Sequence, residues 1–265
     1  MLSDKQLSRL AEQSQLNQPS IIVTRLEDGL GARFADRRPR YPASMIKVPL
    51  VAAGLLLREA GMLAAGPIRV EATNLTANDR PSPLTEGYAA RFEELCELAI
   101  TVSDNVATNV LFDLLGRERA SSLVREALGL RDTGFRRKLS GGHPLIRDPG
   151  QTGRNTHPAA DAARLFAAIA TRAFAGADFL ADLLARQAWN SKLSAGLLPG
   201  DRFAHKTGDT DDVSHDGGIL TTADGRRYVV VVYSASGSSE ATDARFAALM
   251  RELRALLEAR PRHAT

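Results

Sequence analysis

Two residues three positions apart, Ser44 and Lys47, have the types and the spacing that an activated serine nucleophile needs. They open an apolar, alanine-rich stretch that predicts a buried helix over residues 44–61, with Pro49 in its first turns. Side chains at i and i+3 share one face of a helix, so we expect Lys47 beside the Ser44 hydroxyl. A lysine can take the proton of a serine when burial or a second cation favours its neutral form. Taken alone, the pair more often marks a helix cap followed by a lysine that reaches solvent.

A second polar group, Ser103-Asp104-Asn105, interrupts an apolar pattern of helical spacing over residues 92–116. Such residues favour turns and caps, so a simple turn between two helices accounts for them equally well. In a catalytic interpretation, Ser103 relays a proton to the leaving nitrogen. Asn105 then holds both a substrate amide and the side chain of Lys47.

A third group, Lys206-Thr207-Gly208, follows a strand predicted over residues 203–206. Lys206 and Thr207 would bind a substrate carboxylate, and Gly208 would let the substrate approach the backbone closely. The next residue, Asp209, could offer its backbone N–H with that of Ser44 as an oxyanion hole. The alternative is an exposed strand end that enters a turn.

Together, the three groups form a known catalytic signature, and their order and separations resemble those of class A β-lactamases. The segments 81–86, 93–105 and 198–200 resemble the same proteins. Over roughly residues 21–257, the chain therefore resembles the class A β-lactamase and penicillin-binding-protein family of serine hydrolases. The resemblance implies a site between an α/β lobe and a helical lobe. It also implies acylation of Ser44.

The long loop after the second motif departs from that family. Class A β-lactamases carry a glutamate there, which activates the water that hydrolyses the acyl-enzyme. By spacing, Leu139 occupies that position, and no glutamate occurs over residues 127–239. The run Arg136-Arg137-Lys138-Leu139 resembles penicillin-binding relatives that lack the glutamate. We therefore expect slow release of a β-lactam acyl group.

His215 lies near the position where many class A enzymes place an arginine for the substrate carboxylate, so it is a candidate substrate-binding residue. A histidine on a hairpin surface is the alternative. Asp209 would repel a substrate carboxylate unless its side chain points to solvent.

A metal site could be built from the residues around the third motif, but no paired histidine or cysteine spacing supports one. We expect no metal and no cofactor. The residues considered for a metal are His205, Asp209, Asp211, Asp212, His215 and Asp216.

Three functions remain open. The chain could be a β-lactamase with slow deacylation, a D-alanyl-D-alanine carboxypeptidase or esterase, or a penicillin-binding protein that keeps its acyl group without turnover. A Ser-His-Asp hydrolase is disfavoured because the Gly-x-Ser-x-Gly elbow is missing.

Composition limits the partners. A net charge of +3 is too small and too evenly spread to indicate nucleic acid binding, and we expect the run at 136–138 to be a solvated loop. No apolar run approaches the length of a membrane span.

We expect a small-molecule or peptide substrate, a monomer, and a buried Cys96. The start of the chain has no signal-peptide pattern, which predicts a cytoplasmic protein, or a periplasmic or secreted one if a leader has been trimmed.

The predicted architecture is α+β: one antiparallel sheet built from both chain ends and flanked by helices, with an inserted all-helical lobe. One catalytic domain would span residues 1–265, with an α/β lobe at 1–41 and 190–265 and a helical lobe at 42–189. The sequence predicts a first helix with a capping box from Ser3 to Gln6 and a helix capped by Asp178. Strands are expected over 21–27, up to 37, and over 203–206, 217–222 and 227–234. Further helices are expected over 117–128 and 158–170 and at the end of the chain, with a frayed tail from Arg260.

Overall fold

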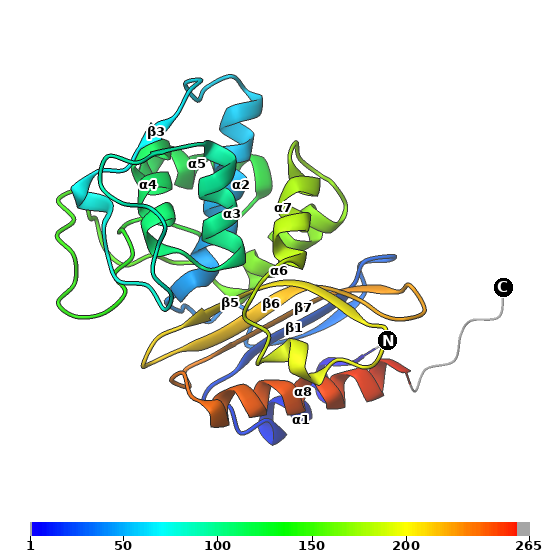
Figure 1. The fold of residues 1–265 in the computed structure, drawn as a ribbon. Helices are drawn as coiled ribbons and strands as arrows, with labels where there is room; N and C mark the ends of the chain where they lie inside the picture. The colour runs from blue at the N-terminus through cyan, green and yellow to red at the C-terminus, as the bar shows by residue number, and fades with distance from the viewer. Residues whose placement is uncertain (1, 259–265) are drawn as a thin grey trace.

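A five-stranded antiparallel sheet runs through the protein, with helices on both of its faces (Figure 1). The computed structural model describes residues 2–258. The strand order is β2-β1-β7-β6-β5, so the N-terminal pair β2-β1 joins the C-terminal strands β7-β6-β5 through the pairing of β1 with β7. This confirms the predicted fold class. The strands are β1 (Ser20–Arg25), β2 (Gly31–Phe34), β5 (Arg202–Asp209), β6 (Ser214–Thr221) and β7 (Arg227–Ser234).

Alternation along the strands fills two separate cores. In β7, Val229 and Val231 face a core shared with α2 and α6, whereas Val230 and Val232 face a core shared with α1 and α8. Successive side chains of a strand point to opposite faces, so a strand buried on both faces reads as a continuous apolar run. The sheet is therefore a middle layer. The position of a residue along β5 therefore decides on which face of the sheet its side chain lies.

The α-helices flank the sheet as Figure 1 shows, with α1 and α8 on one face and the remaining α-helices on the other. Within residues 2–258, no helix combines the length and the apolar character that crossing a bilayer requires. The α-helices are α1 (Asp4–Gln13), α2 (Lys47–Glu59), α3 (Phe92–Thr101), α4 (Asn105–Leu115), α5 (Arg117–Leu128), α6 (Ala159–Ala170), α7 (Ala177–Ala185) and α8 (Glu240–Glu258). The 3-10 helices are η1 (Ala43–Ile46), η2 (Ala72–Asn74) and η3 (Leu193–Gly196), and two short strands, β3 (Ile68–Arg69) and β4 (Ala89–Ala90), pair with each other.

Several local predictions are confirmed. The capping box of Ser3 and Gln6 begins α1, and α5 covers the predicted range. Cys96 is fully buried, and burial raises the pKa of its thiol. The lobe boundaries at 41/42 and 189/190 stay a prediction.

Other local predictions are wrong. Asp178 lies inside the first turn of α7, and Gly176, in the left-handed region at φ 83°, is the N-cap. The run at 136–138 is not a fully solvated loop, because Lys138 is buried and pairs with Asp113 at 2.6 Å. The tail from Arg260 lies outside the described residues.

Candidate active site

Ser44 lies on η1, immediately before α2. The residue before it, Ala43, has a φ of 46°, a left-handed conformation that costs energy for a side chain with a Cβ. Lys47 is the first residue of α2, and Pro49 fits because the first turn of a helix needs no N–H donor from it. The predicted helix therefore begins with one 3-10 turn that carries the serine.

Gly208 brings strand β5 against that turn. A Cβ at Gly208 would lie 2.9 Å from the Pro42 carbonyl oxygen and 3.1 Å from the Ser44 amide nitrogen. Only glycine permits this approach. The third motif is thus inside β5, and the prediction that the strand ends at Lys206 is wrong. Pairing with β6 as far as Asp209 opposite Ser214 keeps the polar segment extended.

The N–H of Asp209 points away from the sheet. β5 is an edge strand, and the N–H of Thr207 faces the side-chain oxygen of Gln187 at 2.8 Å. Backbone directions repeat every second residue of a strand, so the N–H of Asp209 points off the same edge. The Asp209 N–H therefore makes no hydrogen bond to β6 and lies beside the Ser44 turn. The predicted oxyanion hole requires both.

Two buried lysines converge on Ser103. The Nζ atoms of Lys47 and of Lys206 each lie 3.0 Å from the Ser103 hydroxyl oxygen. Lys47 also donates to the Asn105 side-chain oxygen at 2.9 Å and to the Ser103 carbonyl. Lys206 donates to the Thr207 carbonyl at 3.0 Å. The three motifs, far apart in the sequence, therefore meet at one hydroxyl group.

Burial changes the acid–base character of this lysine pair, which we define as Lys47 and Lys206. Both side chains are 0 % exposed. Desolvation, followed by the charge of Lys206, holds the pKa of Lys47 well below its usual range. Desolvation likewise lowers the pKa of Lys206 to about 7, against the opposing effect of nearby carboxylates, of which Asp209 is the largest. A neutral lysine is thus accessible near neutral pH, as a general base requires.

No hydrogen bond joins Lys47 to the Ser44 hydroxyl among residues 2–258. The hydrogen bonds of Lys47 go to Ser103 and Asn105. The expected position of Lys47 beside the Ser44 hydroxyl stays a prediction.

The Ser103 turn is fixed from several sides. Ser103 itself is left-handed, with φ 63°, and Asp104 caps α4 by accepting from the Ala107 N–H at 2.7 Å. The catalytic and the capping interpretations of this motif are therefore compatible. The Trp189 indole donates to the Val102 carbonyl at 3.3 Å. Asn105 is also tethered, with one amide N–H directed to the Ala77 carbonyl at 3.2 Å.

Gln187 was missed by the sequence analysis. With its amide turned so that both of its polar atoms find partners, Gln187 donates to the Ile100 carbonyl at 3.2 Å and accepts from the Thr207 N–H at 2.8 Å, so it links the end of α3 to β5. It holds the second and third motifs in register. A lone glutamine after a helix carries no pattern that would reveal this role.

Leu139 is buried, at 5 % exposed, and its backbone is fixed by one side chain. Asn109 accepts from the Leu139 N–H at 2.7 Å and donates to the Leu139 carbonyl at 3.0 Å. The loop therefore presents a rigid, apolar residue at this position.

One expectation about a polar residue is corrected. His215 is 0 % exposed rather than on a hairpin surface, with its ring nitrogens 2.9 Å from the Tyr41 carbonyl and 2.8 Å from the Ser214 carbonyl. Burial lowers its pKa to about 4, so it is neutral at pH 7 and its nitrogens are occupied. We therefore omit His215 from the substrate contacts proposed below.

The Asp209 side chain is 35 % exposed and also pairs with a lysine. It lies 2.5 Å from Nζ of the buried Lys192, and strand alternation puts it on the face opposite to Lys206. The carboxylate is thus neutralised on the far face of the sheet. It does not repel a substrate carboxylate bound at Lys206.

A Ser-His-Asp arrangement occurs elsewhere. The ring of His205 lies 2.7 Å from Asp216 and 2.9 Å from the Ser194 hydroxyl. The same ring nitrogen that meets Ser194 also meets the Asn190 side-chain oxygen at 3.0 Å, while the Asn190 nitrogen donates to Gln187. That histidine nitrogen must therefore carry a proton and cannot accept one from Ser194. The arrangement is a hydrogen-bond network within the fold.

Comparisons with known proteins agree with this geometry. A model of the "Beta-lactamase enzyme family" matches residues 3–257. A "Beta-lactamase 1" from Streptomyces cacaoi is 42% identical over 59 residues, which cover 21% of this chain and only 18% of that protein.

Solved structures share the fold. A mutant of PBP-A, solved as an acyl-enzyme complex with penicillin G, aligns with a TM-score of 0.81 at 24% identity over 96% of each chain. A β-lactamase from Sphaerobacter thermophilus gives 0.80 at 24% identity, over 96% of this chain and 98% of that one. A variant of the last common ancestor of Gram-negative class A β-lactamases gives 0.79 at 25% identity, over 98% and 99%.

Proposed function

The chain belongs to the β-lactamase enzyme family, and on that premise we propose that it is a serine hydrolase whose acyl-enzyme forms at Ser44. Its substrates would be β-lactams or related amides and esters. The observation that carries the proposal is the meeting of Lys47, Lys206 and Ser103 beside the Ser44 turn. A nucleophile, an accessible base and two candidate oxyanion donors lie within one site.

Acylation would proceed as follows. Neutral Lys47 exchanges one of its present contacts for the Ser44 hydroxyl and takes its proton as the oxygen attacks the substrate carbonyl. Hydrogen bonds in substrate-free sites often tighten only in the reacting complex. The N–H groups of Ser44 and Asp209 stabilise the oxyanion. Ser103 then passes a proton from the lysine pair to the leaving nitrogen, the C–N bond breaks, and the Ser44 ester remains.

Substrate binding would use Lys206, Thr207 and Asn105. Lys206 can donate to a substrate carboxylate, because its carboxylate neighbour Asp209 is occupied by Lys192 on the other face. Asn105 retains a second amide hydrogen for a substrate carbonyl.

Deacylation would be slow for β-lactams. It needs a water held against the ester and a base for its proton, and Leu139 supplies neither. The opened ring of a β-lactam stays attached and obstructs a water, whereas the leaving group of an ester or a peptide departs. This favours turnover of small esters or D-alanyl peptides, and it makes a D-alanyl-D-alanine carboxypeptidase or esterase the second candidate function. A binder that never releases its acyl group is the third.

A time course of intact mass after adding penicillin G tests the proposal. We expect a covalent adduct of the mass of the antibiotic, on the tryptic peptide that carries Ser44, with decay over minutes or longer. Ser44→Ala should not be labelled, whereas the matched control Ser194→Ala should be labelled like the unmodified protein. An adduct that survives in Ser44→Ala would refute the assignment. Clearance many times per second would refute slow deacylation.

A further inference from the structure

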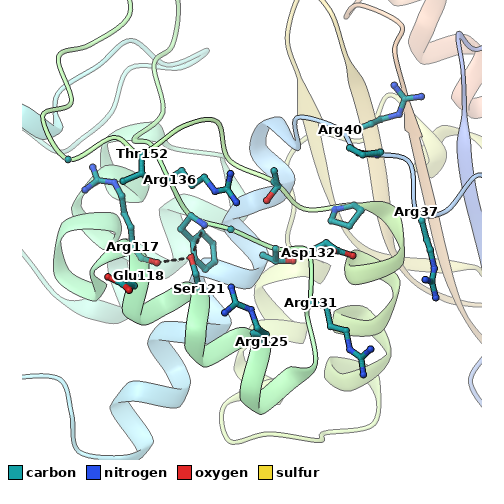
Figure 2. Close-up of a pocket in the computed structure, with 17 residues that line it drawn as sticks. Arg37, Arg40, Arg117, Glu118, Ser121, Arg125, Arg131, Asp132, Arg136 and Thr152 are labelled. Carbon is teal, nitrogen blue, oxygen red and sulfur yellow. Dashed lines mark hydrogen bonds between the residues drawn. The ribbon is translucent and has the colours of Figure 1, made fainter.

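A cavity of about 760 Å³ opens on the side of the molecule where α5 meets the loop that follows it (Figure 2). Three segments form its walls: α5, the loop over residues 131–136 and 150–158, and the connection at 37–40 between β2 and η1. None of the residues of the Ser44 site lines it. We call this cavity the arginine pocket, after its lining arginines: Arg37, Arg40, Arg117, Arg125, Arg131 and Arg136.

Most of this positive charge is unpaired. The pocket contains only two carboxylates, Glu118 and Asp132, against six guanidinium groups. Arg117 pairs with Asp148 at 2.5 Å, but none of the other five pairs with a carboxylate among residues 2–258. Arginines from three segments around one hollow create a concentrated positive potential.

Two of the six arginines are held by the fold. Arg40 donates to the Gln18 carbonyl, and Arg117 pairs with Asp148. Burial, reinforced by the neighbouring Arg38, lowers the pKa of Arg40 to about 10. The other four arginines have no carboxylate partner among residues 2–258, and an anion is the partner that would satisfy their donors and their charge.

The shape of the pocket limits its ligand. Its volume lies within the range of small-molecule sites, about 300–1,000 Å³. Phe135, Pro39 and Pro158 add apolar wall surface beside the arginines. Planar guanidinium groups bind phosphate oxygens in pairs, so several arginines match a ligand with more than one phosphate.

We propose that the arginine pocket binds a small organic diphosphate of the size of a nucleoside diphosphate. The phosphates would lie among Arg125, Arg131 and Arg136, and the organic part would lie against the apolar wall. This inference is independent of the chemistry at Ser44.

Calorimetric titration at low salt tests the proposal on the intact protein. ADP and pyrophosphate are the probes, with AMP and citrate as comparisons. We expect one ADP per chain, weaker binding of AMP and citrate, and weaker ADP binding at higher salt. The double variant Arg125→Ala/Arg131→Ala should lose about tenfold or more in affinity, because each lost charge-assisted hydrogen bond is worth at least that.

The matched control is Arg9→Ala, which removes an exposed arginine on α1, outside the pocket. It should bind ADP like the unmodified protein. The variant Arg125→Lys/Arg131→Lys keeps the charges but removes the paired geometry, and it should fall between the two. Three results would overturn the proposal: no saturable binding of ADP or pyrophosphate at millimolar concentration, equal loss in Arg9→Ala, or citrate binding as tight as ADP. Displacement of ADP by a more tightly bound single-stranded oligonucleotide would also overturn it, in favour of a nucleic acid surface.

Discussion

The Ser44 site and the arginine pocket both gather positive charge, but they hold it in different surroundings. Lys47 and Lys206 are 0 % exposed and share the Ser103 hydroxyl, whereas Arg125 and Arg131 are exposed around a hollow. Burial makes proton loss accessible to a lysine near pH 7. An arginine keeps its proton at any physiological pH. The first region is therefore suited to proton transfer, and the second to attracting an anion.

Among the variants that test this difference, Lys47→Met should show the largest effect. The variant keeps the side-chain volume and removes the base, so acylation should slow by about 10²–10⁴-fold with all substrates. Its stability should change little, because the variant removes a desolvated amine together with its hydrogen bonds to Ser103 and Asn105. Rapid-mixing mass spectrometry and urea unfolding measure the two effects. If acylation stays within about threefold of the unmodified rate, the lysine is not the base.

Leu139→Glu tests the loop that runs between the two regions. A carboxylate at this position should accelerate loss of the penicillin adduct by about 10²-fold, the lower limit for an added general base. Leu139→Gln is the matched control, since it has the same shape and polarity without the base. Both variants should lose similar stability at this buried position. Equal decay rates of the two acyl-enzymes would contradict the role assigned to this position.

Lys206→Gln separates charge from proton transfer within the lysine pair. Acylation by substrates with a carboxylate should fall about 10- to 100-fold, the worth of one charge-assisted hydrogen bond. Neutral esters should be affected much less. Steady-state kinetics with matched acid and ester substrates gives the ratio, and an equal loss for both would exclude carboxylate binding by Lys206.

The lysine pair should also make stability depend on pH. Folded Lys206 loses its proton above about pH 7, whereas the unfolded chain keeps it to about 10.5. The unfolded state therefore binds more protons in this window, so the free energy of unfolding should rise with pH. The unfolding constant should therefore fall by at most about tenfold per pH unit for each lysine. Urea unfolding at several pH values between 7.5 and 9.5 measures it, and Lys206→Met should flatten the curve.

The smallest effect is expected in the arginine pocket. Arg125→Ala/Arg131→Ala removes exposed, unpaired side chains, so the free energy of unfolding should change by no more than about 0.5 kcal/mol. Thermal unfolding without ligand checks this. A large destabilisation would mean that these arginines serve the fold rather than a ligand.

The sequence predicted the fold and the three motifs because both rest on local patterns. Alternation and helical spacing locate the strands and helices, and glycine at 208 signals a close approach. What it could not predict depends on partners distant in sequence. The extension of β5 through Asp209 needs β6, and the burial of His215 needs Tyr41 and Tyr233. The arginine pocket likewise exists only after residues near 40, 125 and 136 have come together.

The position of β7 inside the sheet also decides the order in which the chain can mature during synthesis. β7 lies between β1 and β6, and Ser20 pairs with Tyr233. While the ribosome is still making the helices, β1 and β2 have only each other as neighbours, and an isolated hairpin is marginal in water. The sheet, and with it the contact of Gly208 with the Ser44 turn, closes only after β7 has emerged. The nascent chain therefore carries an unpaired β1 edge for most of its synthesis, and an unpaired edge is where strands of other chains can add.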